Sequence, residues 1–365
     1  MKPKHSRRTL LKRSALGVGA AALASSMPKI ASAQNASAAK PYDMREFVKW
    51  VIDDFEPMVR IPGGAGRYAR KPGDTDYELY GTSDMACVLY TLGKLKPNEQ
   101  ERAEWAQAFQ NFQNPETGML VEKAAPTHVP LHNTAFALAA MQLLDLRPKY
   151  LVKMEEYADP RPFLMNLDWK AAVYTDSHKG AGVGAIYVLA GLGDSKWFEN
   201  YFAACEVLFD PRNGLMGMQK PAAGDFDQIG GTFHYSFLYD YFHRRLPYPE
   251  KRIDAIIGLQ RPDGHWDATN QTWLTMDAIY LLTRTLRYCP HRTDDANSTI
   301  RKALDAMMDQ MFSPDGRKKM LEGRLPAHTV TCAVSTLAEA QIHFGADQII
   351  TEWPLRQILD RRPFI

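Results

Sequence analysis

The sequence predicts an all-α protein in which six helical hairpins close into an (α/α)6 toroid, with an inner and an outer ring of helices. Three observations predict this fold: turn motifs that recur about every fifty residues, two alternating kinds of helix between them, and the lack of a convincing strand run. A fixed period of this length is typical of folds in which one supersecondary unit packs against the next.

Four turns that end on glycine follow apolar helical runs, and they define the period. They are Gln113–Gly118, Asp210–Gly214, Arg261–Gly264 and Ser313–Gly316. Their prolines, at 115, 211, 262 and 314, are 96, 51 and 52 residues apart. The first interval is close to two periods, so we expect a degenerate copy between residues 159 and 176.

Helical periodicity gives two kinds of helix between these turns. Charged, amphipathic helices are expected in the outer ring, at 44–55, 98–112, 161–169, 196–209, 249–260 and 295–312. Helices that are apolar nearly all round must be buried on most sides and are expected in the inner ring. These are 82–95, 132–144, 178–192, 232–244, 272–287 and 328–344.

One turn carries a resemblance. The segment Gln260-Arg-Pro-Asp-Gly264-His-Trp266 is similar to the Q-x-x-x-G-x-W repeat of terpene-cyclase and prenyltransferase toroids, although the other three turns lack the tryptophan. The D-x-D-D acid motif of class II terpene cyclases has no match, and Asp74-Thr-Asp76-Tyr is the nearest segment. The alternating helices also resemble the toroids of polysaccharide lyases and glycoside hydrolases, which implies action on carbohydrates by architecture alone.

Residues 1–34 are predicted to be a twin-arginine signal peptide, with Arg7 and Arg8 before an apolar run and Ala31-Ser-Ala33 as the cleavage site. The run from Ala15 to Ser25 is shorter than the roughly 20 residues that span a bilayer. We therefore expect the Tat translocase as a partner during export, a periplasmic or secreted location, and no membrane association of the mature form. Residues 35–40 are expected to be a linker and 41–365 a single domain.

Composition excludes some functions. Apolar residues make up 45% of the chain and charged residues 24%, with a net charge of +2, so there is no reason to expect a nucleic-acid partner. The four cysteines form no C-x-x-C pair, and we expect free thiols. A metal site would need histidines and aspartates at repeat-scale spacing, and we predict neither a metal nor a cofactor.

Polar residues recur at the starts of the predicted inner helices. His132, His178, His234 and His328 lie there, and in a toroid all these helix starts open on one face, so we expect the four histidines to converge on a funnel. Helix N-termini attract anions and disfavour imidazolium, so the histidines should be neutral. The hydroxyl and amide residues beside them could instead be N-caps.

An anionic poly- or oligosaccharide is the expected substrate, and β-elimination on a uronic-acid glycan is the expected reaction. His132 and Asn133 would neutralise the carboxylate, His234 would be the base, and Tyr235 or Tyr239 the acid. This set resembles the Asn, His, Tyr and Arg constellation of toroidal polysaccharide lyases. The expected substrate-binding residues are His178, Lys179, His328, Asp76, Asp84, Asp176, Asp227, Trp266, Trp273 and Arg284.

Three alternatives stay open. Paired carboxylates among Asp76, Asp176 and Asp227 would suit a glycoside hydrolase. An isoprenoid-converting toroid is disfavoured by the missing D-x-D-D motif. A non-catalytic scaffold that binds glycans or peptides would bind without turnover.

Overall fold

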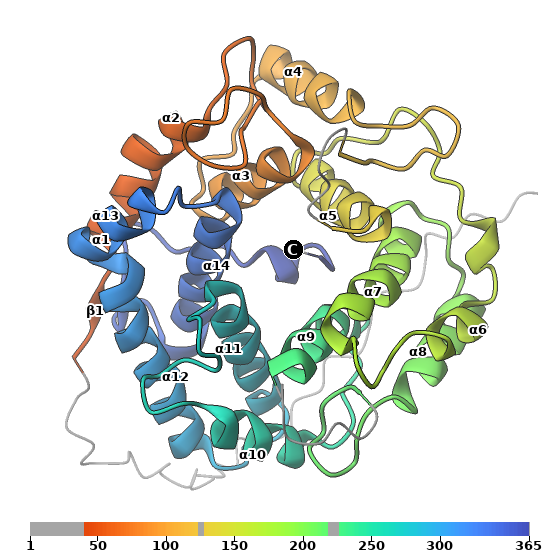
Figure 1. The fold of residues 1–365 in the computed structure, drawn as a ribbon, viewed down its shortest axis with the longest axis vertical. Coiled ribbons are helices and arrows are strands. Elements are labelled where there is room, and N and C mark those ends of the chain that lie inside the picture. The colour runs from red at the N-terminus through yellow and green to blue at the C-terminus, as the bar shows by residue number, and fades with distance from the viewer. Residues whose placement is uncertain (1–39, 123–127, 218–225, 365) are drawn as a thin grey trace, which may run out of the picture. The chain divides into compact units, whose positions relative to one another are not determined.

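The computed structural model describes residues 40–122, 128–217 and 226–364 (Figure 1). Contacts along the chain set Pro41–Ile365 apart from Met1–Lys40 as one compact unit, and the fold described below is that of this unit. The predicted signal peptide, 1–34, and all of the predicted linker except Lys40 lie outside the described residues, so both stay predictions.

The unit is predominantly helical, and six buried helices form its centre (Figure 1). Each of them contacts the next, and the last contacts the first, so their contacts close into a cycle. None of the helices in the described ranges is long and apolar enough to cross a membrane. The six are α3 (Leu79–Thr91), α5 (Pro130–Leu143), α7 (Val173–Leu189), α9 (Phe226–Tyr241), α11 (Thr272–Leu286) and α14 (Ala327–Phe344).

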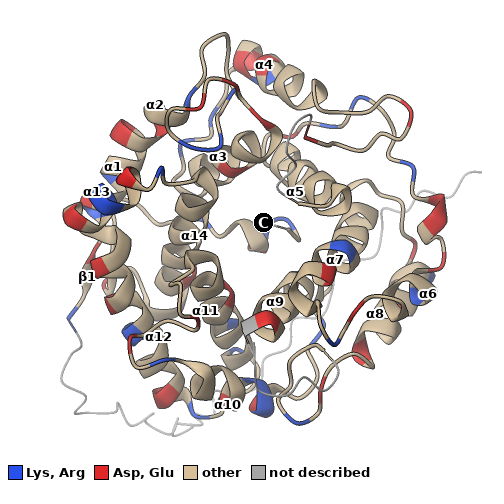
Figure 2. Ribbon diagram, in the orientation of Figure 1, with Lys and Arg blue, Asp and Glu red and all other residues tan. Residues whose placement is uncertain are grey.

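Amphipathic helices lie outside this cycle, and Figure 2 shows that they carry much of the charge. Their apolar residues pack inward while the charged ones face water. They are α1 (Arg45–Trp50), α2 (Glu56–Val59), α4 (Glu99–Gln110), α6 (Pro160–Met165), α8 (Ser195–Glu206), α10 (Pro249–Leu259), α12 (Thr293–Met307) and α13 (Pro314–Glu322). Two π-helical segments, Val51–Phe55 and Met308–Phe312, continue α1 and α12, and short 3-10 helices lie at Glu155–Tyr157 and Ile358–Asp360.

The ends of the unit are joined by a minimal sheet. Strand β1 (Tyr42–Asp43) pairs in parallel with β2 (Ile349–Ile350), and these are the only strands in the described part of the chain. The pairing brings the segment before α1 beside the segment after α14. The expectation of an essentially strand-free fold is therefore confirmed for the described ranges.

Two of the repeat turns use a glutamine in the same way. The Gln113 side-chain amide donates to the carbonyl of Gly118 at 2.8 Å, and that of Gln260 donates to the carbonyl of Gly264 at 3.0 Å. The Gln260 amide also donates to the carbonyl of Thr299 in α12, at 2.9 Å. The glutamine thus fixes its turn and, in the second case, ties it to the next outer helix.

The glycines of these turns show where the repeat holds and where it changes. Gly264 has a φ of +93°, and a Cβ on it would lie 2.6 Å from the carbonyl oxygen of Lys302, so its structural role is confirmed. The fourth turn differs because Ser313 caps α13, its side chain accepting from the Gly316 N–H with Pro314 in the first turn. That glycine is therefore helical.

Candidate functional site

Four imidazoles lie close together at the inner helices. The ring centroids of His132 and His178 are 4.6 Å apart, those of His178 and His234 are also 4.6 Å apart, and those of His132 and His234 are 5.9 Å apart. A fourth ring, from His128, lies 4.4 Å from His132 and 4.8 Å from His178. The structure therefore brings three of the four predicted histidines together and adds one that was not predicted.

Three of these rings, those of His128, His132 and His234, line a cavity with a volume of about 20 Å³, which is enough for a water molecule or an ion. The His178 ring is not part of the lining but packs against all three. His328, the fourth predicted histidine, lines the same cavity from α14. The rest of the lining is mostly aromatic. The lining residues are Tyr80, His128, His132, Tyr174, Phe233, His234, Trp273, Met276, Asp277 and His328.

The histidines do not occupy equivalent positions in the repeat, contrary to expectation. Thr134 and Thr232 are equivalent, because each accepts a hydrogen bond from a backbone N–H of the preceding turn, at 3.1 and 2.8 Å. His132 precedes its threonine by two residues and His234 follows its threonine by two. His234 is therefore one helical turn deeper, about 6 Å along the axis, because α9 begins before the polar residues that were taken as its start.

Burial keeps most of these imidazoles neutral. It lowers the pKa of His132 and His178 well below the usual value, and that of His128 and His234 to about 3, with the neighbouring histidines adding to the shift. The neutral histidines expected from the sequence agree with these pKa shifts. That expectation attributed the neutral form to the helix N-termini, however, whereas the main cause is burial. His178 and His234 lie beyond the first turn of their helices, where the field of the N-terminus is weak.

His328 is the exception. Burial opposes its charged form, but contacts with Cys332 and Asp84 outweigh burial and raise its pKa well above the usual value. Its Nδ1 lies 3.0 Å from Asp84 Oδ1. Burial in turn raises the pKa of Asp84. His328 is therefore the one of the four predicted histidines that favours the imidazolium form.

The hydrogen bonds of His234 define its tautomer. Ser177 Oγ donates to the backbone carbonyl of Tyr174 at 2.5 Å, so its only proton is used. The same oxygen lies 2.8 Å from His234 Nδ1, which must then carry the proton and donate it. The Nε2 of His234 is left with a lone pair that can accept a proton.

Two aromatic rings lie at the partly exposed side of the cavity. Tyr174 and Trp273 stack with a centroid distance of 4.6 Å and an interplanar angle of 19°. Burial raises the pKa of the Tyr174 hydroxyl well above its usual value, so it remains a proton donor at neutral pH. Asp277, inside the cavity, has its pKa raised well above the usual value by burial. It is a neutral carboxylic acid.

The two tyrosines predicted as acids lie elsewhere. The ring of Tyr235 packs 5.7 Å from Trp169, and that of Tyr239 packs 4.8 Å from Phe202 in α8. Neither lines the cavity. The cause is helical geometry, since a residue next to His234 points to a different side of α9.

The predicted carboxylate-binding amide is already engaged. Asn133 Nδ2 donates to Glu122 Oε2 and to the backbone carbonyl of His128, each at 3.3 Å. Its Oδ1 is buried without a partner, so the side chain offers an acceptor and not a donor.

The predicted acidic residues do not gather as a pair. Asp176 forms an ion pair with Lys179 at 2.6 Å and accepts a hydrogen bond from the backbone N–H of Asp168 at 2.7 Å. Asp176 and Lys179, which were both predicted to bind substrate, therefore bind each other. Asp76 is exposed in the loop before α3, and Asp227 is partly buried in the first turn of α9. None of the three lines the cavity.

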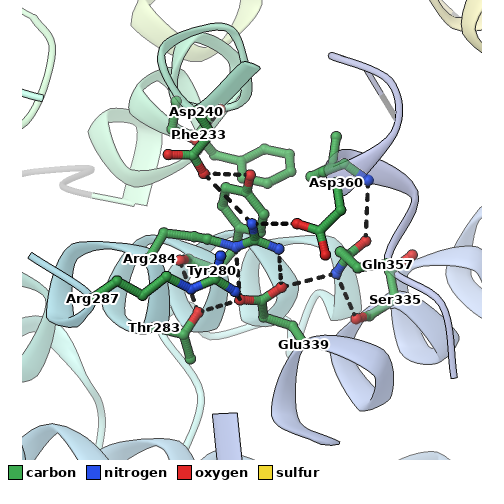
Figure 3. Close-up of polar contacts among 12 residues, drawn as sticks. Phe233, Asp240, Tyr280, Thr283, Arg284, Arg287, Ser335, Glu339, Gln357 and Asp360 are labelled. Atoms are coloured by element: carbon green, nitrogen blue, oxygen red, sulfur yellow. Dashed lines mark hydrogen bonds and ion pairs between the residues drawn. The ribbon is translucent and has the colours of Figure 1, made fainter. Parts of the chain in front are cut away.

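Arg284 and Trp266 have structural positions. Arg284, near the C-terminal end of α11, is buried and pairs with Glu339 and Asp360, each at 2.6 Å (Figure 3). It lies 11 residues after Trp273, about 16 Å along the helix, and is not at the cavity. Trp266 is buried, and its indole N–H donates to the carbonyl of Ile256 at 2.8 Å.

Comparisons with known proteins do not place the chain in a family. No family model matches it, and no curated protein matches it. The site must therefore be interpreted from its own geometry.

Sequence reasoning missed several residues at the site, and three of them show why. His128 lies four residues before His132 in His-Val-Pro-Leu-His, a short spacing that the sequence displays. Asp277 is a single acidic residue in an apolar helix, which is also a visible signal. Phe364, whose ring lies 4.9 Å from His132, comes from the C-terminal segment, and nothing in its local sequence predicts that contact.

Proposed function

We propose that the chain is an (α/α)6 toroid exported by the twin-arginine route, and that its histidine cluster is the active site of a polysaccharide lyase. The substrate would be a glycan containing uronic acid. The observation that carries the proposal is the convergence of His132 and His234 on one cavity, with the His178 ring packed against both and all three imidazoles held neutral. The closed cycle of contacts among the six inner helices supports the toroid.

His234 is the proposed base. Its Nδ1–H donates to Ser177 Oγ, so its Nε2 can accept the proton from C5 of the uronic acid. The C4–O bond then breaks, a C4=C5 double bond forms, and the leaving oxygen needs a proton.

Tyr174 is the proposed acid, in place of Tyr235 and Tyr239, because its ring lines the cavity and contacts the His178 ring at 4.6 Å. Its hydroxyl proton would pass to the leaving oxygen. His328, which favours the imidazolium form, would stabilise the negative charge that develops on the substrate carboxylate.

The sugar would bind at the mouth of the cavity, because about 20 Å³ is too small for a sugar ring. Tyr174 and Trp273 offer an apolar stacked surface there, of the kind that sugar rings pack against. The reacting hydrogen would point inward to the histidines.

Glycoside hydrolysis is the second candidate, and Asp277 favours it. A carboxylic acid kept neutral at pH 7 can act as a general acid, and Asp277 lines the cavity in that form. This reaction also needs a second carboxylate, and Asp84, which contacts the cavity residue His328, is the candidate.

The test is incubation of the purified mature protein with a panel of uronic-acid glycans. A lyase gives an unsaturated product that absorbs ultraviolet light, whereas a hydrolase gives new reducing ends without that absorbance. Binding without turnover would identify a scaffold and would overturn the enzymatic proposal.

A matched pair of variants tests the assignment of the acid. Tyr174→Phe and Tyr235→Phe each remove one hydroxyl, and only the first should lower turnover. Equal loss of turnover in both variants would contradict the role of Tyr174.

A further inference from the structure

Three imidazoles of the histidine cluster bring ring nitrogens close to one another. His128, His132 and His178 each offer a ring nitrogen, and these three atoms lie within 4.8 Å of one another. The rings come from two directions, since His178 is on α7 while His128 and His132 flank the start of α5.

Two ring nitrogens on these histidines are buried without a hydrogen-bond partner. They are His132 Nδ1 and His178 Nε2, on side chains that are only 2% and 4% exposed. An unpaired buried polar atom costs roughly 1–3 kcal/mol, so two at one site call for a ligand. The adjoining cavity of about 20 Å³ has room for one.

We propose that His128, His132 and His178 bind a divalent transition-metal ion, with zinc as the expected metal. Three neutral imidazoles are the ligands that zinc accepts at sites that keep a fourth position open. The nitrogens of a tetrahedral site would be about 3.3 Å apart, given zinc–nitrogen bonds of about 2.0–2.1 Å. Side-chain movements of about 1–2 Å would bring the three nitrogens from their present spacing to that of a zinc site.

The surroundings suit such a site. His128 lies just before α5, and its backbone carbonyl accepts from Asn133 Nδ2, which fixes the chain at that point. Pro130 begins the helix, and its fixed φ restrains the backbone between His128 and His132.

The metal ion also extends the proposed function, and this step rests on that function. An ion with an open position beside His234 would bind the carboxylate of a uronic acid and place the sugar next to the base. Asn133 was predicted for that task, but its amide donor is already used.

The test is titration of the chelator-treated mature protein with Co²⁺, followed by displacement with Zn²⁺. We expect one equivalent of cobalt with the intense visible absorption of a tetrahedral site. His132→Ala and His178→Ala should weaken binding by more than the roughly 10- to 100-fold that loss of an outer-shell partner costs. His343→Ala, at a histidine that instead contacts Asn297, is the control and should still bind one equivalent.

Circular dichroism on each variant shows whether it has folded, and X-ray absorption of the zinc-loaded wild-type protein counts imidazole ligands without any variant. Lack of saturable binding in the folded wild-type protein, or unchanged binding in both alanine variants, would overturn the proposal. The two proposals fail separately: cobalt binding without an unsaturated product leaves the metal site standing, and the product without cobalt binding leaves the lyase standing.

Discussion

At the scale of single residues, burial and close contacts set the chemistry around the cavity. The neutral histidines, the neutral Asp277 and the protonated Tyr174 all follow from removal of ionisable groups from water. His328 departs from this pattern because its contacts with Cys332 and Asp84 raise its pKa. The site thus combines neutral bases with groups that retain their protons.

Glu78 gives a test of burial that does not involve the histidines. Burial, together with the hydrogen bond and the charge of Glu122, raises the pKa of Glu78 to about 9. In the unfolded chain the pKa is about 4.3. The folded protein therefore binds a proton that the unfolded chain has lost, and the stability from this group decreases as the pH rises from about 4.3 to about 9.

We predict that Glu78→Gln raises the melting temperature relative to the wild type, by an amount that grows between pH 5 and pH 8. Glutamine keeps the acceptor oxygen that the Gly81 N–H uses but cannot ionise. Thermal unfolding of both proteins across this range measures the difference. A difference that does not change with pH would show that Glu78 titrates normally.

Two glycines give a matched pair of substitutions. Gly264→Ala should destabilise the protein by more than about 1 kcal/mol, because of its positive φ and the clash of the new Cβ with the Lys302 carbonyl. Gly258, in the interior of α10, has open space around its Cβ position, so Gly258→Ala should stabilise by up to about 1 kcal/mol. Urea unfolding should give opposite signs, and the same sign for both would contradict the turn geometry.

At the scale of elements, the C-terminal segment contacts two separate parts of the inner helices. Asp360 pairs with Arg284 near the C-terminal ends of the inner helices (Figure 3), whereas Phe364 reaches the His132 ring. The segment therefore forms part of the wall of the histidine cluster.

We predict that Arg284→Ala costs about 3–5 kcal/mol, because it leaves the buried Glu339 without its main partner. Arg287→Ala is the control, since this side chain is 45% exposed and lies 3.4 Å from the same carboxylate, and it should cost at most about 1 kcal/mol. Urea unfolding measures both. Similar losses in the two variants would mean that Arg284 does not anchor this network.

Much of the helical pattern is visible in the sequence, because helix type follows from periodic burial. The ends are less visible: α9 begins at Phe226, six residues before the predicted Thr232. That shift misaligned the repeat and put Tyr235 in the site, although its ring faces Trp169. Contacts across long sequence separations, such as that of Phe364 with His132, leave no local pattern to detect.

At the scale of the whole molecule, the closed cycle of inner helices explains why distant residues meet. His128 and His328 are 200 positions apart in the chain yet line one cavity. They meet because α14 contacts α3, and α3 in turn contacts α5, the helix that begins just after His128. The site therefore depends on closure of the entire unit.

The predicted twin-arginine export gives a second test at the scale of the whole molecule. We predict that replacing Arg7 and Arg8 together by lysine leaves the protein in the cytoplasm, because the twin-arginine pair identifies the precursor to the translocase. Cell fractionation with an antibody against the mature protein measures this. Normal periplasmic accumulation of the double variant would show that another route carries the chain.

The central claim, that the histidine cluster is catalytic, is tested most directly by the turnover of His234→Ala, measured together with its melting temperature. We predict that turnover of a uronic-acid glycan falls by on the order of a hundredfold or more, as expected for loss of a general base, while the melting temperature changes little. Unchanged turnover, or a loss of stability that accounts for the lost activity, would contradict the claim and leave His234 as a structural residue.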